Sequence, residues 1–488
     1  MLTRLEVDGF KNLRGAVIEF GPFTCIAGEN GAGKSNVFDA IEFLSLLASH
    51  SLMEAAQRIR STRDDRSGDP RDLFWRGSAR SAAATEKVSE PVGNGRLMRL
   101  AAEMIVPDQV EDDFGRQAEA SITFVRYEVD IGHEPATGLQ KIGRLVLVRE
   151  SLQPIRLGDA HRRLGFRHSA KRFRRNALKG RRSGGPFIST QQDEGDQVIV
   201  VHQDGGSRGK PKPASAARAP ATVVSTITGA DDPTILAARR EMQSWRQLAL
   251  EPSALRASDR YHDPRVMAID GQHLPAALFR IATRQPASGA APDPDGTYAR
   301  VTNRLSALTG VGVRRVLVDT DDMRELITLK LEEPNGVELP ARSLSEGTLR
   351  FLALAVLSED PDARGIICME EPENGMHPAN LEAMVDLLRD LAFDPFDETG
   401  DDNPFRQVIA NTHSPSLVQL LKPEELLFAS ADFAPRGDGE IARALRLAPL
   451  KGTWRDERLE VPPVTKTDIL PYLTSPVDTQ LSLDSVPA

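Results

Sequence analysis

The opening of the chain shows two hydrophobic patterns, one typical of strands and one of a helix. Apolar and polar residues alternate over 2–7 and 16–20, on either side of a turn region with two glycines, which predicts a hairpin. Residues 23–27 form a short apolar run that predicts a buried strand. Apolar residues then recur at helical spacing over 37–47. A glycine-rich loop therefore joins a buried strand to a helix.

Later apolar runs predict further strands and helices, separated by loop-rich stretches. Strand-like runs lie at 120–131, 143–149, 313–331, 365–369 and 407–411. Helical spacing covers 233–250, 297–309, 349–357 and 380–391. Small and polar residues predict loops at 204–221 and 285–297 and a disordered tail after about residue 475. No heptad run is long enough to predict a coiled coil. Together these patterns indicate an α/β protein.

The composition indicates a globular protein but does not indicate its function. The 488 residues are 40% hydrophobic and 27% charged, as in an ordinary globular protein. A net charge of -9 argues against extensive coating by nucleic acid, although it allows one basic patch. Cys25 and Cys368 lie in apolar runs, which favours small buried side chains over a disulfide or a metal site. Charge interrupts the opening residues, and no run reaches the roughly 18 apolar residues of a membrane span, so we expect a cytoplasmic protein without a membrane partner.

The glycine-rich loop carries the strongest chemical signal. Residues 28–35 fit the phosphate-binding loop (P-loop) pattern G-x-x-x-x-G-K-[ST] in full, between a buried strand and a helix. Glycines let backbone N–H groups curl around phosphate oxygens because they have no Cβ to clash. Lys34 would add positive charge at the β- and γ-phosphates, and the Ser35 hydroxyl would be a ligand of Mg²⁺. The predicted nucleotide contacts are Gly28, Asn30, Gly31, Ala32, Gly33, Lys34, Ser35 and Asn36.

The second signal is an apolar strand that ends in two acids. The run 365–369 leads directly into Glu370 and Glu371. At such a strand end Glu370 would hold Mg²⁺ through water, while Glu371 would orient or deprotonate the attacking water. The same residues also fit a buried strand that runs out into an acidic turn. The P-loop earlier in the chain makes this second interpretation the weaker one.

Two further signals are weak when taken singly. Ser345 and Gly347 open the helix predicted at 349–357, where a serine can be an anion site or only an ordinary cap. His413 follows the strand predicted at 407–411, and a lone histidine there is more often a surface or core residue than a catalytic one. Their fixed order after the P-loop gives both of them more weight.

In this order of motifs the chain resembles the ABC-type P-loop ATPases. Within them it is most similar to the SMC, RecF and OLD-like branch, and to stand-alone AAA family ATPases of bacterial defence loci. Residues 9–13 resemble the N-terminal strand motif of that branch, 345–348 its signature loop and 375–378 its D-loop. The resemblance covers 1–50 and 340–425 firmly and the middle of the chain loosely.

The resemblance implies that nucleotide is shared between two copies of the chain. In such proteins ATP and Mg²⁺ lie between the P-loop of one subunit and the signature loop of another. Ser345 and Gly347 would then contact the γ-phosphate across a homodimer or a higher oligomer, and His413 would be the switch histidine. ATP would hold the closed form together and its hydrolysis would release it.

Two positions depart from the family pattern. Glu370 stands where the family has an aspartate, and its additional methylene bears on the metal geometry and on the rate of turnover. The Q-loop glutamine of the family has no secure place in this sequence. Gln203 is one candidate, although a polar loop residue is the better interpretation of its surroundings.

Residues 161–182 hold the densest positive charge of the chain, with ten arginines and lysines. Such density could bind the backbone of a nucleic acid without sequence preference. Only Phe166 and Phe173 interleave with the charges as stacking groups. A solvated loop, or a loop that binds an acidic partner, fits the same pattern.

We therefore expect an ABC-type ATPase head, a mixed sheet with flanking helices, that carries an inserted, mostly helical lobe and no coiled coil. The expected divisions are the P-loop part at 1–150, the inserted lobe at 151–310, the part with the signature loop and acidic strand at 311–430, and a C-terminal extension at 431–488. The leading function is a slow ATP-hydrolysing switch that senses nucleic acid and controls a separate effector, such as a nuclease or toxin, in anti-phage defence. The defence context comes from the resemblance alone. The alternatives are a RecF-like repair or replication ATPase that acts directly on DNA, and an ATP-binding scaffold with little turnover.

Overall fold

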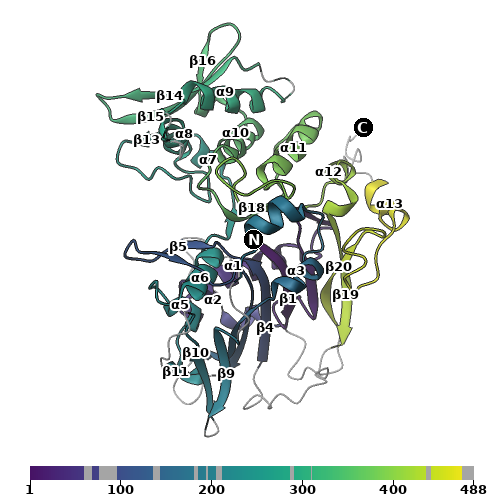
Figure 1. Cartoon of the computed structure of the whole chain (residues 1–488). Helices are drawn as coiled ribbons and strands as arrows, with labels where there is room; N and C mark the ends of the chain where they lie inside the picture. Colours follow the sequence, from purple (N-terminus) through teal and green to yellow (C-terminus); the bar gives the residue numbers. More distant parts are fainter. Residues whose placement is uncertain are drawn as a thin grey trace.

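A computed structural model describes most of the chain, and two large sheets dominate it (Figure 1). The tail that we predicted to be disordered lies outside the described residues, as do Arg181 and Arg182 of the basic segment. The described residues are 1–59, 69–75, 96–135, 143–180, 185–193, 196–204, 212–285, 289, 291–308, 310, 312–435 and 441–474.

A six-stranded sheet runs through the middle of the molecule and carries the P-loop. Its strand order is β12-β17-β18-β3-β19-β20, and all neighbours are parallel except the β19–β20 hairpin. Strands β3 and β18 are buried along their whole length, as is typical of a parallel sheet that is covered on both faces. The strands are β3 (Phe23–Gly28), β12 (Arg246–Leu248), β17 (Gly365–Glu370), β18 (Arg406–Thr412), β19 (Leu426–Pro435) and β20 (Ile441–Pro449).

An eight-stranded antiparallel sheet forms the other large layer, in the order β11-β10-β9-β8-β7-β4-β1-β2. The hairpin predicted over 2–20 is its β1–β2 edge. The strands are β1 (Leu2–Asp8), β2 (Ala16–Glu19), β4 (Arg96–Ile105), β7 (Phe124–Glu134), β8 (Arg144–Pro154), β9 (Ile188–Asp193), β10 (Asp196–Val201) and β11 (Lys212–Ser215). A separate two-stranded ribbon pairs β5 (Gln109–Glu111) with β6 (Gln117–Glu119).

Residues 151–310, which we expected to form a mostly helical insertion, are divided differently. Their first part continues the eight-stranded sheet through β8–β11, because β9 and β10 pair over six residues each, although the outer half of β9 is polar and exposed. Helices gather instead between residues 252 and 391, above the six-stranded sheet (Figure 1). This helical lobe holds α7 (Pro252–Leu255), α8 (Leu274–Thr283), α9 (Pro294–Leu305), α10 (Glu346–Ser358) and α11 (Leu381–Leu391). Its small sheet is made of β13 (Asp259–Arg260), β14 (Arg315–Asp321), β15 (Leu326–Glu332) and β16 (Glu338–Pro340).

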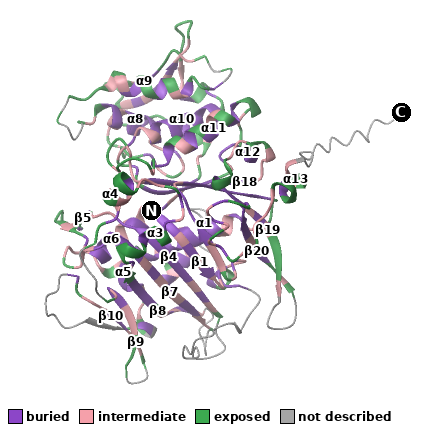
Figure 2. Cartoon of the chain, turned by 45° about the vertical axis from the view of Figure 1, so that its right-hand side comes forward, coloured by how far each residue is buried: buried purple, intermediate pink, exposed green. Residues whose placement is uncertain are grey.

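The six-stranded sheet divides the interior into two cores (Figure 2). One core lies between the two large sheets and encloses the helix that follows the P-loop, and the other lies beneath the helical lobe. Both cysteines are buried and free, and burial raises the pKa of each thiol. In the described ranges the longest helices have 13 residues, and none could cross a bilayer. The remaining helices are α1 (Ser35–Leu47), α2 (Leu52–Arg58), α3 (Ala160–Arg163), α4 (Arg175–Ala177), α5 (Val223–Thr226), α6 (Pro233–Gln243), α12 (Pro415–Gln419) and α13 (Lys466–Thr474).

Candidate functional site

The P-loop connects the end of β3 to the start of α1, as the sequence predicted. The buried Lys34 side chain folds back across the loop, and its Nζ donates to the carbonyl oxygens of Gly28 at 2.6 Å and Glu29 at 2.9 Å. Burial lowers the pKa of this ammonium, although the negative charge of Glu371 acts in the opposite direction. Ser35 is the first residue of α1, so its hydroxyl lies at the positive end of that helix.

Asn12 of the N-terminal motif forms hydrogen bonds with the P-loop and with the residue that follows it. Its Nδ2 donates to the carbonyl of Ala32 at 3.0 Å, and its Oδ1 accepts from Asn36 Nδ2 at 2.6 Å. A Cβ on Gly33 would lie 2.2 Å from Asn12 Nδ2, and Gly33 also has a φ of +102°. Only glycine fits this position of the loop, because any side chain would both clash and adopt a strained backbone.

Two acids and a histidine meet beside the P-loop, at the carboxyl ends of β17 and β18. His413 Nδ1 lies 2.7 Å from Glu371 Oε1, and Asn374 Nδ2 donates to Glu371 Oε2 at 2.8 Å. Glu371 has a φ of +46°, and its N–H donates to the carbonyl of Asn411 at 3.0 Å. A non-glycine residue in this left-handed region costs roughly 1–3 kcal/mol, and such strain concentrates at functional sites.

A third glutamate at this edge of the sheet, Glu373, was not singled out as a site residue from the sequence. Glu373 is buried and accepts a hydrogen bond from the Thr412 hydroxyl. Burial raises the pKa of the Glu373 carboxyl, although the hydrogen bond from Thr412 acts against that rise. Its place directly after the acidic strand was the available signal in the sequence.

Gln247, rather than Gln203, is the glutamine at the site. Gln247 Nε2 donates to Glu370 Oε1 at 3.3 Å, from strand β12 on the far side of β17. Both residues line a cavity of about 340 Å³ together with Glu371 and Arg350. Gln203 is exposed after β10, in the eight-stranded sheet. The sequence predicted one helix over 233–250, so Gln247 was not expected on a strand. In the structure α6 ends at Gln243.

The signature loop belongs to the helical lobe. Ser345 is exposed and caps α10, with its Oγ accepting from the N–H of Thr348 at 3.2 Å. Gly347 is buried, and a Cβ there would lie 2.7 Å from the carbonyl oxygen of Gly375. The signature loop and the D-loop are therefore packed against each other, while the Ser345 hydroxyl bonds at the start of its own helix.

The aromatic residues of the basic segment are not available for stacking on bases. Phe166 and Phe173 are 5% and 0% exposed and pack with Phe393 and Phe405 in a cluster of rings. The idea that these two rings stack on nucleic-acid bases is therefore wrong. The charges themselves are at the surface, and those classed as exposed are Arg162, Arg163, Arg167, Lys171, Arg172, Arg175 and Lys179.

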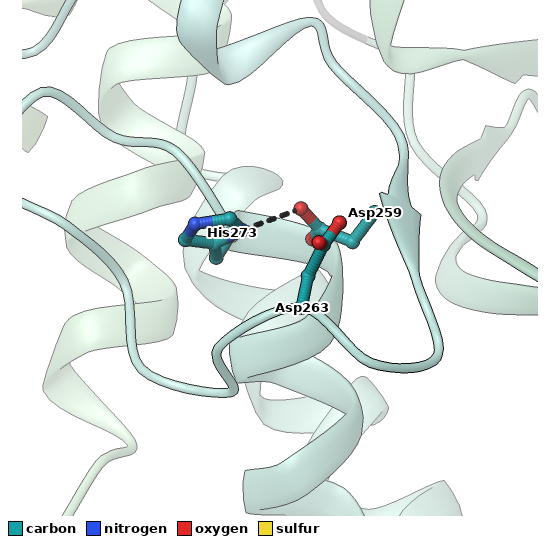
Figure 3. A group of neighbouring side chains, drawn as sticks. All are labelled: Asp259, Asp263 and His273. Atoms are coloured by element: carbon teal, nitrogen blue, oxygen red, sulfur yellow. Dashed lines mark hydrogen bonds and ion pairs between the residues drawn. The ribbon is translucent and has the colours of Figure 1, made fainter.

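A group of three possible metal ligands lies away from the P-loop, in the helical lobe (Figure 3). His273 Nδ1 lies 2.9 Å from Asp259 Oδ1, and Asp259 Oδ2 accepts from the N–H of Ala276 at 2.9 Å. Asp263 Oδ2 accepts from the N–H of Arg260 at 2.7 Å. These bonds identify Asp259 as a cap for the start of α8, whose positive end does not favour a cation.

Comparisons with known proteins find two family models that match separate parts of the chain, and each part contributes residues to the candidate site. Residues 1–64 match the model of the RecF/RecN/SMC N-terminal domain family. Residues 226–419 match the model of the family described as AAA domain, putative AbiEii toxin, Type IV TA system. The first stretch contains the P-loop, and the second contains the signature loop, the acidic strand and the histidine.

Individual relatives align over short stretches of the chain. Structural maintenance of chromosomes protein 1 of Schizosaccharomyces pombe is 56% identical over 52 residues, which are 10% of this chain and 4% of that protein. The DNA replication and repair protein RecF of Phocaeicola vulgatus is 39% identical over 61 residues, or 12% of this chain and 16% of that protein. The matches thus span less than a fifth of each of these relatives.

Solved structures of SMC heads align over most of the chain at low scores. An SMC head bound to the C-winged helix domain of ScpA is 14% identical, with 92% of this chain and 98% of that chain covered and a TM-score of 0.43. The SMC head domain from Thermotoga maritima is 13% identical, with 92% and 99% covered and a TM-score of 0.35. Scores this low add nothing to the description of the fold. The two family matches do, since between them they contain all the motifs of the candidate nucleotide site, and they support an ABC-type P-loop ATPase of the SMC and RecF branch.

Proposed function

We propose that this chain is an ATP-hydrolysing switch that closes as a homodimer around ATP and controls a separate effector. The observation that carries the proposal is the 2.7 Å contact between Glu371 and His413 beside the P-loop. The strand order β17-β18-β3 puts the acid, the histidine and Lys34 on three neighbouring strand ends. This arrangement suits activation of a water molecule next to a bound triphosphate.

The residues of the loop fit ATP with Mg²⁺. Gly31 and Gly33 have φ values of +74° and +102°, which let the backbone N–H groups turn toward one anion. We assign phosphate binding to these N–H groups and to Lys34, whose ammonium would leave the loop carbonyls for phosphate oxygens. Ser35 and Glu370 would hold Mg²⁺, which when bound neutralises charge on the phosphates.

Glu371 is the proposed general base. Its carboxylate would take a proton from water as the water oxygen attacks the γ-phosphorus, and the bond to the leaving ADP would break. His413 and Asn374 hold both carboxylate oxygens at 2.7 and 2.8 Å, which fixes the direction of the acceptor. Gln247 would be coupled to the same site through its hydrogen bond to Glu370. The longer side chain at Glu370 makes slow turnover the expected behaviour.

A second copy would complete the site. Ser345 and Gly347 begin α10 in the helical lobe, and the exposed Ser345 hydroxyl faces no partner beyond its own helix start in the described part of the chain. We assign these two residues to the γ-phosphate held by the other subunit, as the family resemblance implies. Nucleotide would then stabilise the closed dimer because it binds only that form at both of its faces.

Complementation between two inactive variants tests this composite site. Lys34→Ala should abolish ATP binding, and Ser345→Arg should leave binding intact but stop hydrolysis. Each variant alone should be inactive. Mixing them should restore hydrolysis, since Lys34 of one chain would meet Ser345 of the other. Mixtures that stay inactive, although both variants are folded and oligomerise, would exclude a site shared in this way.

Two observations bear on the cellular role. The family that matches 226–419 is described as a putative toxin of a Type IV system, which favours control of an effector such as a nuclease or toxin in defence. The match of 1–64 to the RecF family, and the exposed charges of 161–182, favour a RecF-like ATPase that acts on DNA. Stimulation of hydrolysis by DNA alone would support the second function. Unchanged hydrolysis, together with stable association with a toxin or nuclease, would support the first.

A further inference from the structure

The β19–β20 hairpin forms one wall of the P-loop. Strand β19 pairs with β3 as far as Gly28, which lies opposite Ala429. A Cβ on Gly28 would lie 2.1 Å from the Ala429 carbonyl oxygen, so the two backbones are in direct contact. The hairpin then continues to Pro435, six residues past the end of β3 and roughly 20 Å at the rise of an extended strand. Its outer part therefore pairs with β20 but extends past β3, beside the loop.

The face of the hairpin that carries Arg443 can be identified from its register. Side chains of opposed residues, and of every second residue, share one face of a sheet. Leu445 and Leu447 are buried in the core that also holds α1, so Arg443 lies on the same face two residues further out. Its cross-strand partner is Phe433, which is 68% exposed. The face next to the loop thus ends in an exposed arginine and an exposed ring.

The guanidinium of Arg443 lies beside the phosphate-binding glycines. A Cβ on Gly31 would lie 3.8 Å from Arg443 Nη1, and this is the nearest atom that such a Cβ would meet. Within the described ranges Arg443 has neither a hydrogen bond nor an ion pair. Lys34, in contrast, is held by two loop carbonyls. An exposed arginine that has no ion pair among the described residues thus lies next to a loop shaped for an anion.

The geometry points to Arg443 as a nucleotide-binding residue that contacts the phosphate chain from the β19–β20 hairpin of the same subunit. This assignment rests on the proposed function, since it requires that the P-loop binds nucleotide. A guanidinium presents several N–H donors in a planar fork that matches two phosphate oxygens, and such charge-assisted bonds are stronger than neutral ones. Bound phosphate would supply an ionic partner, which Arg443 does not have among the described residues.

Isothermal titration of the full chain with ATP and with ADP tests the assignment. Arg443→Ala should weaken binding of both nucleotides by about tenfold, the size expected for loss of a charge-assisted hydrogen bond. Arg443→Lys keeps the charge but loses the fork, so its affinity should be intermediate. Arg446→Ala is the matched control, because Arg446 lies on the opposite face of β20 and donates to the carbonyl of Pro462 at 2.9 Å. Its nucleotide affinity should equal that of the unchanged chain.

The outcomes separate this inference from the proposed function. Equal affinities for the unchanged chain and Arg443→Ala would overturn the role of Arg443 and leave the P-loop assignment in place. Equal losses in Arg443→Ala and Arg446→Ala would also overturn it, since they would show a general effect of the hairpin. An unchanged chain that binds neither nucleotide would overturn both. Thermal unfolding without nucleotide verifies that each arginine variant is folded.

Discussion

The two large sheets share a core but differ in what their strand ends carry. In the six-stranded sheet the strands are parallel, so the ends of β3, β17 and β18 meet at one edge with the P-loop, Glu371 and His413. In the eight-stranded sheet the strands are antiparallel, and charged side chains pair with one another. Arg126, for example, pairs with Glu6 and Glu128 at 2.7 Å each. Parallel strands thus gather reactive groups at one place, whereas the antiparallel sheet supplies support.

The largest expected effects come from replacing one glutamate in each sheet, because one substitution should lower kcat and the other should lower stability. Glu371→Gln should lower kcat by about 10²–10⁴-fold, because an amide cannot accept the proton from water. Its melting temperature should change little, since Glu371 is partly exposed. Glu150→Gln should do the reverse, because Glu150 is buried in the eight-stranded sheet and accepts from the N–H groups of Val223 and Val224. Steady-state hydrolysis and thermal unfolding of both variants measure the contrast.

A hydrolysis rate of Glu371→Gln equal to that of the unchanged chain would contradict its role as general base. A loss of kcat in Glu150→Gln without loss of stability would contradict the division between the two sheets. Binding of ATP should persist in both variants, because neither side chain belongs to the loop that we propose binds the phosphates.

Replacing one glycine in each sheet compares the two sheets by the change in the free energy of unfolding. Gly28→Ala should lower the free energy of unfolding by about 3 kcal/mol and weaken ATP binding, since the new Cβ would overlap the Ala429 backbone. Gly132→Ala in β7 is the control, where a Cβ would lie 3.2 Å from a Val146 methyl group that can yield. Its cost should stay below about 1 kcal/mol, because alanine also restricts the unfolded chain. Denaturant titrations report both values, and equal costs would contradict the close approach at Gly28.

The difference between the sheets also explains how much could be predicted from the sequence. Strands β3, β17 and β18 are short apolar runs followed directly by motifs, so both their burial and their chemistry were readable. Gln247 was missed because β12 has only three residues and follows a helix without a break in polarity. What makes it a strand is its parallel pairing with 367–369, a contact distant in sequence.

The strands of the eight-stranded sheet were harder to predict from the sequence, and the reason is physical. The exposed end of β9 is made of Gln191, Gln192 and Asp193, which carry no apolar alternation. Polar strands of this kind are held by backbone pairing to their neighbours, and side-chain patterns indicate that pairing only weakly. The helical lobe was placed too early in the chain for the same reason, because polar strands were taken for loops within a helical insertion.

The stability of the eight-stranded sheet should depend on pH through Glu150. Burial raises the pKa of its carboxyl from an ordinary value of 4.5 to about 7. Between these values the folded chain keeps a proton that the unfolded chain has lost, so the contribution of Glu150 is complete below about pH 4.5 and is lost as the pH rises through about 7. The loss amounts to at most about 3 kcal/mol. The stability difference between the unchanged chain and Glu150→Gln should therefore be larger at pH 5 than at pH 8.

Denaturant unfolding of both proteins at the two pH values measures this difference, and the other titrating groups cancel in the subtraction. A difference that grows with pH would show that the folded chain holds Glu150 as a carboxylate, bound by the two backbone N–H groups of α5 and by Tyr127. The kcat of Glu150→Gln should show no corresponding change with pH.

The smallest expected effect concerns the basic segment, which joins the two sheets. It follows β8 and is tied to the loop before β18, where the N–H of Ser169 donates to the Pro395 carbonyl at 2.9 Å. Because its rings are buried, any binding to nucleic acid must come from its charges. Replacing Arg172, Arg174 and Arg175 with alanine should weaken binding to a DNA duplex by several-fold and reduce the slope of log K against log salt by about 2–3.

Arginines on the small sheet of the helical lobe supply the matched control for this loss. Replacing Arg314, Arg315 and Arg324, which are 63%, 50% and 78% exposed, removes the same charge from the chain. If the segment binds DNA, fluorescence anisotropy should show the smaller slope only when 172–175 is altered. Equal slopes in both triple variants would reduce the effect to net charge, and the segment would then be a surface loop that fastens one sheet to the other.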